Sequence, residues 1–156
     1  MDEYGIKQWA LIGRKLNEIY GIRGRTGKQC RERWHNHINP QVKKTWIGHE
    51  EEGLIFKALR KYGTKWAEIA KDVPGRTDNI VKNHFYSIIR KEIRRIKKYL
   101  KHDIPVYDNI TIELIFEMLK KYKVPISVLR NEYVINEIIF IGGDEISSNI
   151  LFQLNI

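Results

Sequence analysis

Residues Gly24–Trp34, GRTGKQCRERW, return 51 positions later as Gly75–Phe85, GRTDNIVKNHF. The echo continues upstream, where Trp9–Ile12 (WALI) matches Trp66–Ile69 (WAEI). A segment that occurs twice indicates two copies of one structural unit. Each copy consists of a helix, a tight Gly-Arg-Thr turn and a helix rich in basic side chains, which is the plan of a helix-turn-helix. In such units the last helix is the one that enters a groove of DNA.

The charge of the chain is unevenly distributed. The net charge is +9, but residues 1–102 hold 24 Lys and Arg against 11 Asp and Glu, whereas residues 103–156 hold 4 against 8. A basic segment favours a polyanionic partner, because neutralised phosphates release counterions. A solvated basic surface is the alternative. The sequence contains no apolar run of the length needed to span a membrane, and its N-terminus lacks the features of a signal peptide.

Periodicity and capping signals predict an all-α protein. Apolar residues at helical spacing predict helices over residues 9–16, 26–38, 50–62, 66–71, 78–102 and 111–122. Thr26 and Thr77 are predicted to cap the helices that follow them. We expect an irregular segment over residues 17–23, with Gly21 as a break. Residues 125–141 are apolar and fit either a helix or a strand, up to a break at Gly142-Gly143.

Two segments resemble a known family. Gly24–Pro40 (GRTGKQCRERWHNHINP) and Trp66–Ser87 (WAEIAKDVPGRTDNIVKNHFYS) resemble the second and third repeats of the Myb DNA-binding domain, and the resemblance covers residues 4–92. It implies two tandem three-helix helix-turn-helix repeats, each built around spaced aromatic residues. The aromatic core positions implied here are Trp9, Trp34, Trp46, Trp66 and Phe85.

The resemblance also suggests how the chain is divided. We expect a first repeat over residues 1–40, a linker over 41–45, a second repeat with an extended last helix over 46–101, and an acidic, apolar and mostly helical C-terminal region over 102–156.

The sequence departs from the family pattern in four places. The first repeat begins near the end of its first helix, about six extra residues lie between Ile12 and Gly24, and Phe85 replaces the usual third tryptophan. Trp46 comes one residue early, so Ile47 is an alternative occupant of that core position.

The outward faces of the two last helices carry side chains suited to reading bases. Lysine can donate to guanine, glutamate can accept from the amino group of cytosine, and asparagine can pair with adenine. The resemblance assigns base contacts to Lys28, Glu32, Asn36, Asn79, Lys82, Asn83 and Ser87. It implies a target that contains A-A-C. For Glu32, an ion pair with Arg31 or Lys28 is the alternative.

Other cations are candidates for contacts with phosphates. They are Arg25, Arg33, Lys43, Lys44, Lys65 and Arg76. Some could pair with acidic residues instead, and a pair between Arg76 and either Glu51 or Glu68 would be structural. The outer face of the last helix carries a further basic run, which is either solvated or close to phosphate: Arg90, Lys91, Arg94, Arg95, Lys97 and Lys98.

These observations favour a sequence-specific binder of double-stranded DNA, acting as a Myb-type transcription regulator in the nucleus. The alternative is a SANT-like module that binds chromatin or other proteins, although such modules tend to have acidic third helices. Residues 103–156 could bind a protein partner. The sequence contains no recognisable catalytic set, so we expect no enzyme, cofactor or small-molecule substrate. Helical geometry separates Cys30 from His35, so we expect no metal site there.

Overall fold

The computed structural model describes residues 8–22, 24–101 and 110–153, with side chains described as far as residue 143. Every regular element in these ranges is helical, so the predicted all-α class is confirmed. The elements are α1 (Trp9–Tyr20), α2 (Gly27–Arg33), the π-helical turn η1 (Trp34–Ile38), α3 (His49–Tyr62), α4 (Trp66–Lys71), α5 (Asp78–Leu100), α6 (Ile112–Lys121), the 3-10 turn η2 (Ile126–Val128) and α7 (Glu132–Gln153).

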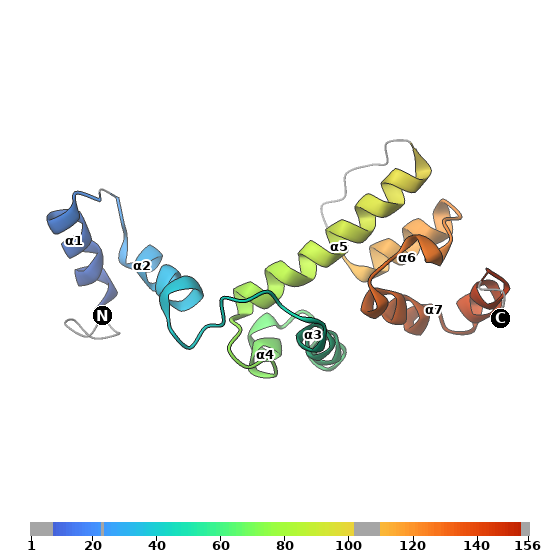
Figure 1. Cartoon of the computed structure of the whole chain (residues 1–156), viewed down its shortest axis with the longest axis horizontal. Helices are drawn as coiled ribbons and strands as arrows, with labels where there is room; N and C mark the ends of the chain where they lie inside the picture. The colour runs from blue at the N-terminus through green and yellow to red at the C-terminus, as the bar shows by residue number, and fades with distance from the viewer. Residues whose placement is uncertain (1–7, 23, 102–109, 154–156) are drawn as a thin grey trace.

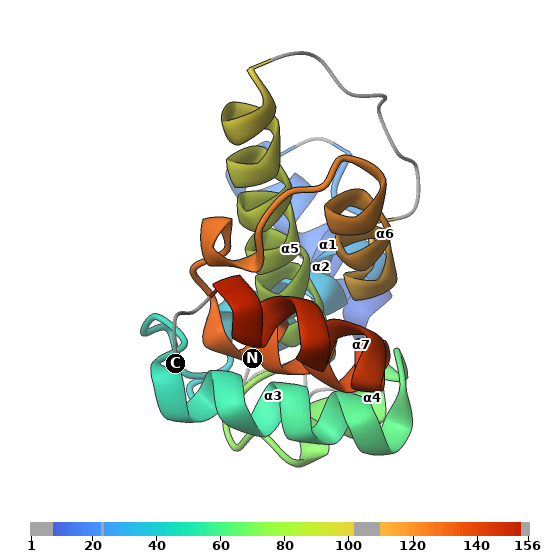
Figure 2. The ribbon, with the colours of Figure 1, turned by 90° about the vertical axis from the view of Figure 1, so that its right-hand side faces the viewer.

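The molecule is organised along α5, its longest helix. In Figure 1, α1 and α2 lie at one end of the chain, α3 and α4 pack near the start of α5, and α6 and α7 lie beside its second half. Figure 2 shows α7 running alongside α3. The second repeat is therefore covered on one side by the C-terminal helices.

Local capping chemistry sets the starts and ends of these helices. Thr26, Thr77 and Thr111 each accept a hydrogen bond from the backbone N–H three residues further on, which satisfies a donor that the first turn leaves unpaired. Gly21 and Gly63 end α1 and α3 with φ angles of 63° and 60°, a conformation that glycine adopts without steric cost.

The structure corrects the prediction for one segment and resolves the ambiguity in another. The expected irregular segment over residues 17–23 was wrong in part, since α1 continues to Tyr20. No glycine or proline lies between Gly13 and Gly21 to end it earlier. The ambiguous stretch over residues 125–141 contains η2 and most of the part of α7 that precedes its kink at Gly143, and no strand. The predicted break is confirmed at Gly143, where φ is 47° and ψ is −138° inside α7.

The second repeat has a small core of its own. Its buried members are Ile55, Ala58, Ile69, Val73 and Val81. Ile47 packs against this cluster, whereas Trp46 is 96% exposed. The expectation that Trp46 is a core aromatic is therefore wrong, because the one-residue offset turns its side chain outward and gives the core position to Ile47.

A second, larger core joins the repeat to the C-terminal helices. Phe85 is buried in it, and Trp66 packs against Phe85 with ring centroids 5.3 Å apart. Ile96 from α5, Ile115 from α6 and Ile138 from α7 are fully buried in the same cluster. The core thus includes residues on both sides of 102–109, although the predicted domain boundaries themselves stay predictions.

Two carboxylates are buried where these helices meet. Glu92, 1% exposed, accepts hydrogen bonds from Arg95 and from the backbone N–H of Arg130. Glu137 on α7, 7% exposed, accepts one from Nε of Arg60 on α3 at 2.6 Å. Buried charges of this kind require partners, and removing one partner is strongly destabilising. They tie α7 and the segment that precedes it to the second repeat.

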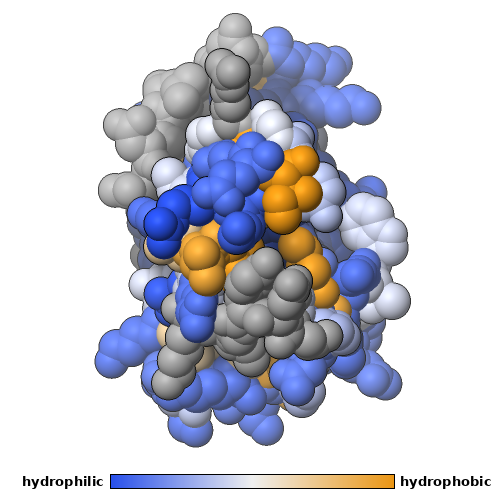
Figure 3. All heavy atoms as spheres, turned by 90° about the vertical axis from the view of Figure 1, so that its left-hand side faces the viewer, coloured by the Kyte–Doolittle hydropathy of each residue, from blue (hydrophilic) through white to orange (hydrophobic). Residues whose placement is uncertain are grey.

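The first repeat is packed differently. Among its described residues in α1, α2 and η1, Gly13 alone is buried, and Trp9 and Trp34 are half-buried. Figure 3, which faces this end of the molecule, shows hydrophobic side chains at the surface between hydrophilic ones. A Cβ on Gly27 would lie 2.8 Å from the backbone of Ala10, so α1 and α2 meet through a glycine. The expected incomplete first helix falls on residues 1–7, outside the described residues.

The shared core predicts a large effect of truncating one of its central side chains. Ile96→Ala should lower the free energy of unfolding by about 2–5 kcal/mol, since it removes a fully buried side chain and leaves a cavity. Urea denaturation followed by circular dichroism measures this change. Leu54→Ala, at a position 40% exposed, is the control and should cost less than about 1 kcal/mol. Equal losses in the two variants would contradict the shared core.

Candidate nucleic-acid interface

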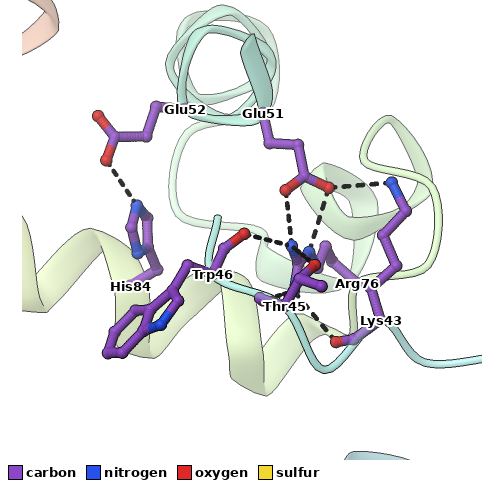
Figure 4. Close-up of polar contacts among 7 residues, drawn as sticks. All are labelled: Lys43, Thr45, Trp46, Glu51, Glu52, Arg76 and His84. Carbon is purple, nitrogen blue, oxygen red and sulfur yellow. Dashed lines mark hydrogen bonds and ion pairs between the residues drawn. The ribbon is translucent and has the colours of Figure 1, made fainter. Parts of the chain in front are cut away.

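The turn before α5 is held by the side chain of Arg76. This residue is 7% exposed, and its guanidinium binds the carboxylate of Glu51 with two hydrogen bonds, Nη2 to Oε2 at 2.7 Å and Nε to Oε1 at 3.2 Å. Figure 4 shows Glu51 descending from α3 onto the guanidinium. The two-point geometry fixes the start of α3 against the turn.

The same guanidinium also binds the linker. Its Nη1 donates to the carbonyls of Lys43 and Thr45 at 3.1 and 2.7 Å, and its Nη2 donates to the carbonyl of Trp46 at 3.0 Å. The backbone N–H of Lys43 donates to the carbonyl of Gly75 at 2.9 Å. The linker between the repeats is therefore tied to the turn that precedes α5.

This position corrects one of the sequence-based assignments. Arg76 was a candidate for phosphate contact, but its donors all point to Glu51 and to the linker, and its side chain is 2% exposed. The structural alternative, a pair with Glu51, is the one that the protein forms. Glu68 pairs instead with Lys71 at 2.8 Å.

The charge of Glu51 is strongly stabilised by these contacts. The hydrogen bond from Arg76 lowers the pKa of Glu51 from 4.5 to about 2, with further help from Lys43 and against the opposing effect of burial. Glu51 therefore remains a carboxylate throughout the ordinary pH range.

The predicted base-contacting residues of α2 and η1 do not share one environment. Lys28 and Glu32 are exposed on α2, whereas Asn36 is half-buried. The Nδ2 of Asn36 donates to the carbonyl of Glu32 at 3.1 Å, and its Oδ1 accepts from Oγ1 of Thr77 at 2.9 Å. Asn36 thus connects the end of the first recognition helix to the cap of the second. In the described residues, Glu32 forms no ion pair with Arg31 or Lys28.

The predicted residues on α5 lie on its open side. Asn79, Lys82 and Asn83 are exposed and Ser87 is half-buried. The Nδ2 of Asn83 lies 3.4 Å from Oδ1 of Asn79, so the two amides are neighbours on one face. The opposite face of the helix is buried in the two cores. The helix therefore presents polar groups outward from a rigid support.

The remaining phosphate candidates are accessible. Arg25, Arg33, Lys43, Lys44 and Lys65 are all exposed. The Nζ of Lys43 lies 3.1 Å from Oε1 of Glu51, so this lysine is partly neutralised. Arg25 precedes α2 and Arg33 ends it, Lys44 lies in the linker, and Lys65 directly precedes α4, so these four stay candidates for phosphate contact.

Sequence reasoning missed a polar link between the reading helix and the C-terminal helices. The Nε2 of His84 on α5 lies 2.9 Å from Oε1 of Glu52 on α3, as Figure 4 shows. The other oxygen of Glu52 accepts from Nδ2 of Asn131 at 3.1 Å. These residues lie far apart in the sequence and match no motif, so only the fold reveals their contact.

Within the described residues, no group of three or more His, Cys, Asp and Glu side chains could hold a metal ion. No helix in that part of the chain is long and apolar enough to cross a membrane.

Comparison with known proteins identifies the repeats. The family described as Myb-like DNA-binding domain matches residues 1–38 and 48–89. The chain belongs to this family. The two matched ranges contain one Myb repeat each, and they end before the last turns of α5 and before α6 and α7.

Curated relatives agree with this assignment. Over 91 residues, 58% of the chain, it is 55% identical to Myb-related protein B of Gallus gallus. Over 104 residues, 67% of the chain, it is 48% identical to Myb-related protein A of Homo sapiens. The chain spans about an eighth of the length of these relatives, since the matches cover 12% and 13% of them.

A solved Myb structure has a similar fold. Myb2 of Trichomonas vaginalis, in complex with MRE-1-12 DNA, shares 34% sequence identity with the chain and superposes with a TM-score of 0.50. The alignment covers 58% of this chain and 76% of that one. The similarity supports the tandem arrangement of the two Myb repeats.

The ion pair between Glu51 and Arg76 predicts a specific pH dependence of stability. Because the folded pKa of Glu51 is lowered to about 2, its contribution is complete above pH 4.5 and is lost as the pH falls toward 2. The difference in unfolding free energy between wild type and Glu51→Gln should therefore shrink by up to about 3 kcal/mol between pH 5 and pH 2.

Chemical denaturation at a series of pH values measures this difference. Glu113→Gln removes an exposed carboxylate on α6 and serves as the matched control, with a difference from wild type that stays nearly constant. A Glu51→Gln difference that is equally flat would show that the pair does not stabilise the linker and the turn.

Proposed function

We propose that this chain binds double-stranded DNA in a sequence-specific manner and acts as a Myb-type transcription regulator in the nucleus. The observation that carries the proposal is the juxtaposition of the two recognition helices. The hydrogen bond between Asn36 and Thr77, 2.9 Å long, places the end of η1 beside the start of α5. Two helices in this relation can lie in neighbouring parts of one major groove.

The exposed side chains fit the chemistry of base recognition. Lys28 can donate to guanine and Glu32 can accept from cytosine, whereas Asn79 and Asn83 can each pair with adenine. The two reading faces thus differ although their scaffolds match, so the proposed target consists of two adjacent and different subsites. The relative that is solved with DNA, Myb2 of Trichomonas vaginalis, supports this mode of binding.

Asn36 takes a different role in this proposal from the one that the resemblance implied. Its side chain is engaged at both ends, with the carbonyl of Glu32 and the hydroxyl of Thr77. We therefore assign to it the positioning of the two helices, and the base contacts to the exposed residues around it.

A SANT-like interaction module is the second candidate. It is less well supported, because the outward faces of α2 and α5 are basic rather than acidic. The surface that could serve a protein partner lies instead on α7, where Ile139, Phe140 and Ile141 are exposed.

Binding measurements with matched duplexes test the proposed function. Wild type should prefer a duplex that contains A-A-C over one of permuted sequence. Asn83→Ala and Lys28→Ala should each weaken binding to the preferred duplex by about 1–3 kcal/mol, since each loses a base contact, and should change binding to the permuted duplex much less.

Fluorescence anisotropy at a fixed salt concentration gives these affinities. Lys57 is an exposed lysine on α3 that lines a shallow pocket between α3 and α7. Lys57→Ala is the control that removes one positive charge away from the proposed interface. If the first two variants lost the same affinity for both duplexes, the residues would contact phosphates alone and the assignment of base reading would be wrong.

A further inference from the structure

The recognition helix of the second repeat extends well beyond the repeat itself. The family match ends at residue 89, whereas α5 continues without interruption to Leu100. In Figure 1 it is one unbroken helix that projects past α3 and α4. The extension must therefore be explained by something other than the core of a Myb repeat.

The two sides of this extension have opposite characters. Ile93 and Ile96 are buried against the C-terminal helices, and Glu92, the only acidic residue of α5 after Asp78, is also buried. Arg90, Lys91, Arg94, Lys98 and Lys101 are exposed on the other side. No described residue forms an ion pair with Arg90, Arg94 or Lys98.

The exposed cations continue the face that is proposed to read bases. With 3.6 residues per turn, Arg90 lies about 20° around the helix axis from Asn79, Arg94 about 60° and Lys98 about 100°. Arg90 and Arg94 therefore point to the same side of α5 as Asn79 and Asn83, and Lys98 lies at the margin of that side, about 60° from Asn83. They form one stripe with the reading residues, displaced along the axis.

The displacement along α5 decides what this stripe can contact. At a rise of about 1.5 Å per residue, Arg90 lies about 16 Å beyond Asn79, and the major groove is about 12 Å wide. A helix whose first turns lie in the groove has therefore left it by Arg90 and passes the phosphates at the groove edge. Arginine and lysine at that place meet phosphate oxygens rather than bases.

The C-terminal helices give the extension its rigidity. Without α6 and α7, Ile93 and Ile96 would be exposed to water and the last three turns of α5 would lack tertiary support, which helices of this kind need. The buried pair of Glu92 with Arg95 and the backbone of Arg130 adds a polar tether. The extended part of α5, beyond residue 89, therefore has a fixed orientation before DNA binds.

We propose that Arg90, Arg94 and Lys98 form a phosphate-binding stripe that extends the DNA contact onto the duplex flank next to the subsite read by α5. The proposal rests on the DNA binding proposed above. It also assigns a role to the C-terminal region. Helices α6 and α7 support the extended part of α5, which adds DNA affinity without adding sequence specificity.

The salt dependence of binding tests the stripe. The variant R90Q/R94Q/K98Q should show a shallower dependence of the logarithm of affinity on the logarithm of salt concentration, by about 2–3 in the slope, because three phosphate contacts release fewer counterions. The variant K57Q/K61Q/K121Q removes the same net charge from exposed positions on α3 and α6 and should leave the slope within about 1 of wild type. Circular dichroism and thermal melting establish that both variants are folded.

A series of duplexes with one flank shortened at a time locates the contact. Wild type and the control variant should lose affinity when one flank is shortened and not the other, whereas R90Q/R94Q/K98Q should be insensitive to either. If wild type prefers its target but the two triple variants share one salt slope and one flank dependence, the stripe is overturned and the proposed function stands. If wild type shows no preference among duplexes and no flank dependence, both proposals fail.

Discussion

The structure depends on the burial of one face of α5. That face packs against α3 and α4 in the second repeat and then, without interruption, against α6 and α7. Because the buried apolar residues of the helix lie on this side, the exposed polar residues Asn79, Asn83, Arg90 and Arg94 are left together on the other. The hydrophobic effect drives this burial without any preferred direction. As a result, the exposed polar side chains of α5 lie in one row along the helix.

A second constraint acts at the turn before α5. Arg76 joins Glu51 on α3 to the carbonyls of Lys43 and Thr45 in the linker and of Trp46 just after it. Thr77, the next residue, both caps α5 and donates to Asn36. The orientation of the two repeats is thus set by two neighbouring residues in one turn. A few partly buried hydrogen bonds of Arg76 and Thr77 therefore set how the exposed faces of α2 and α5 are oriented relative to each other.

Much of this could be predicted because it is local in sequence. The repeated turn, the threonine caps and the apolar spacing of α5 are all visible within a dozen residues. Two alternatives that the sequence left open needed the fold to decide them. Arg76 pairs with Glu51, 25 positions away, rather than standing free for phosphate, and Ile47 rather than Trp46 packs on the core. No sequence motif indicates that α6 and α7 pack on α5, since the apolar spacing of these helices is common to the helices of many proteins.

In the proposed mode of binding, α2 and α5 read two adjacent and different sets of bases. Selection of bound duplexes from a random pool, using wild type, K28A/E32A and N79A/N83A, is the sharpest test of this division. Wild type should yield a two-part motif, K28A/E32A should lose one part alone, and N79A/N83A should lose the other part alone. A motif that degrades as a whole in both variants, or no motif in wild type, would rule out separate base reading by the two helices.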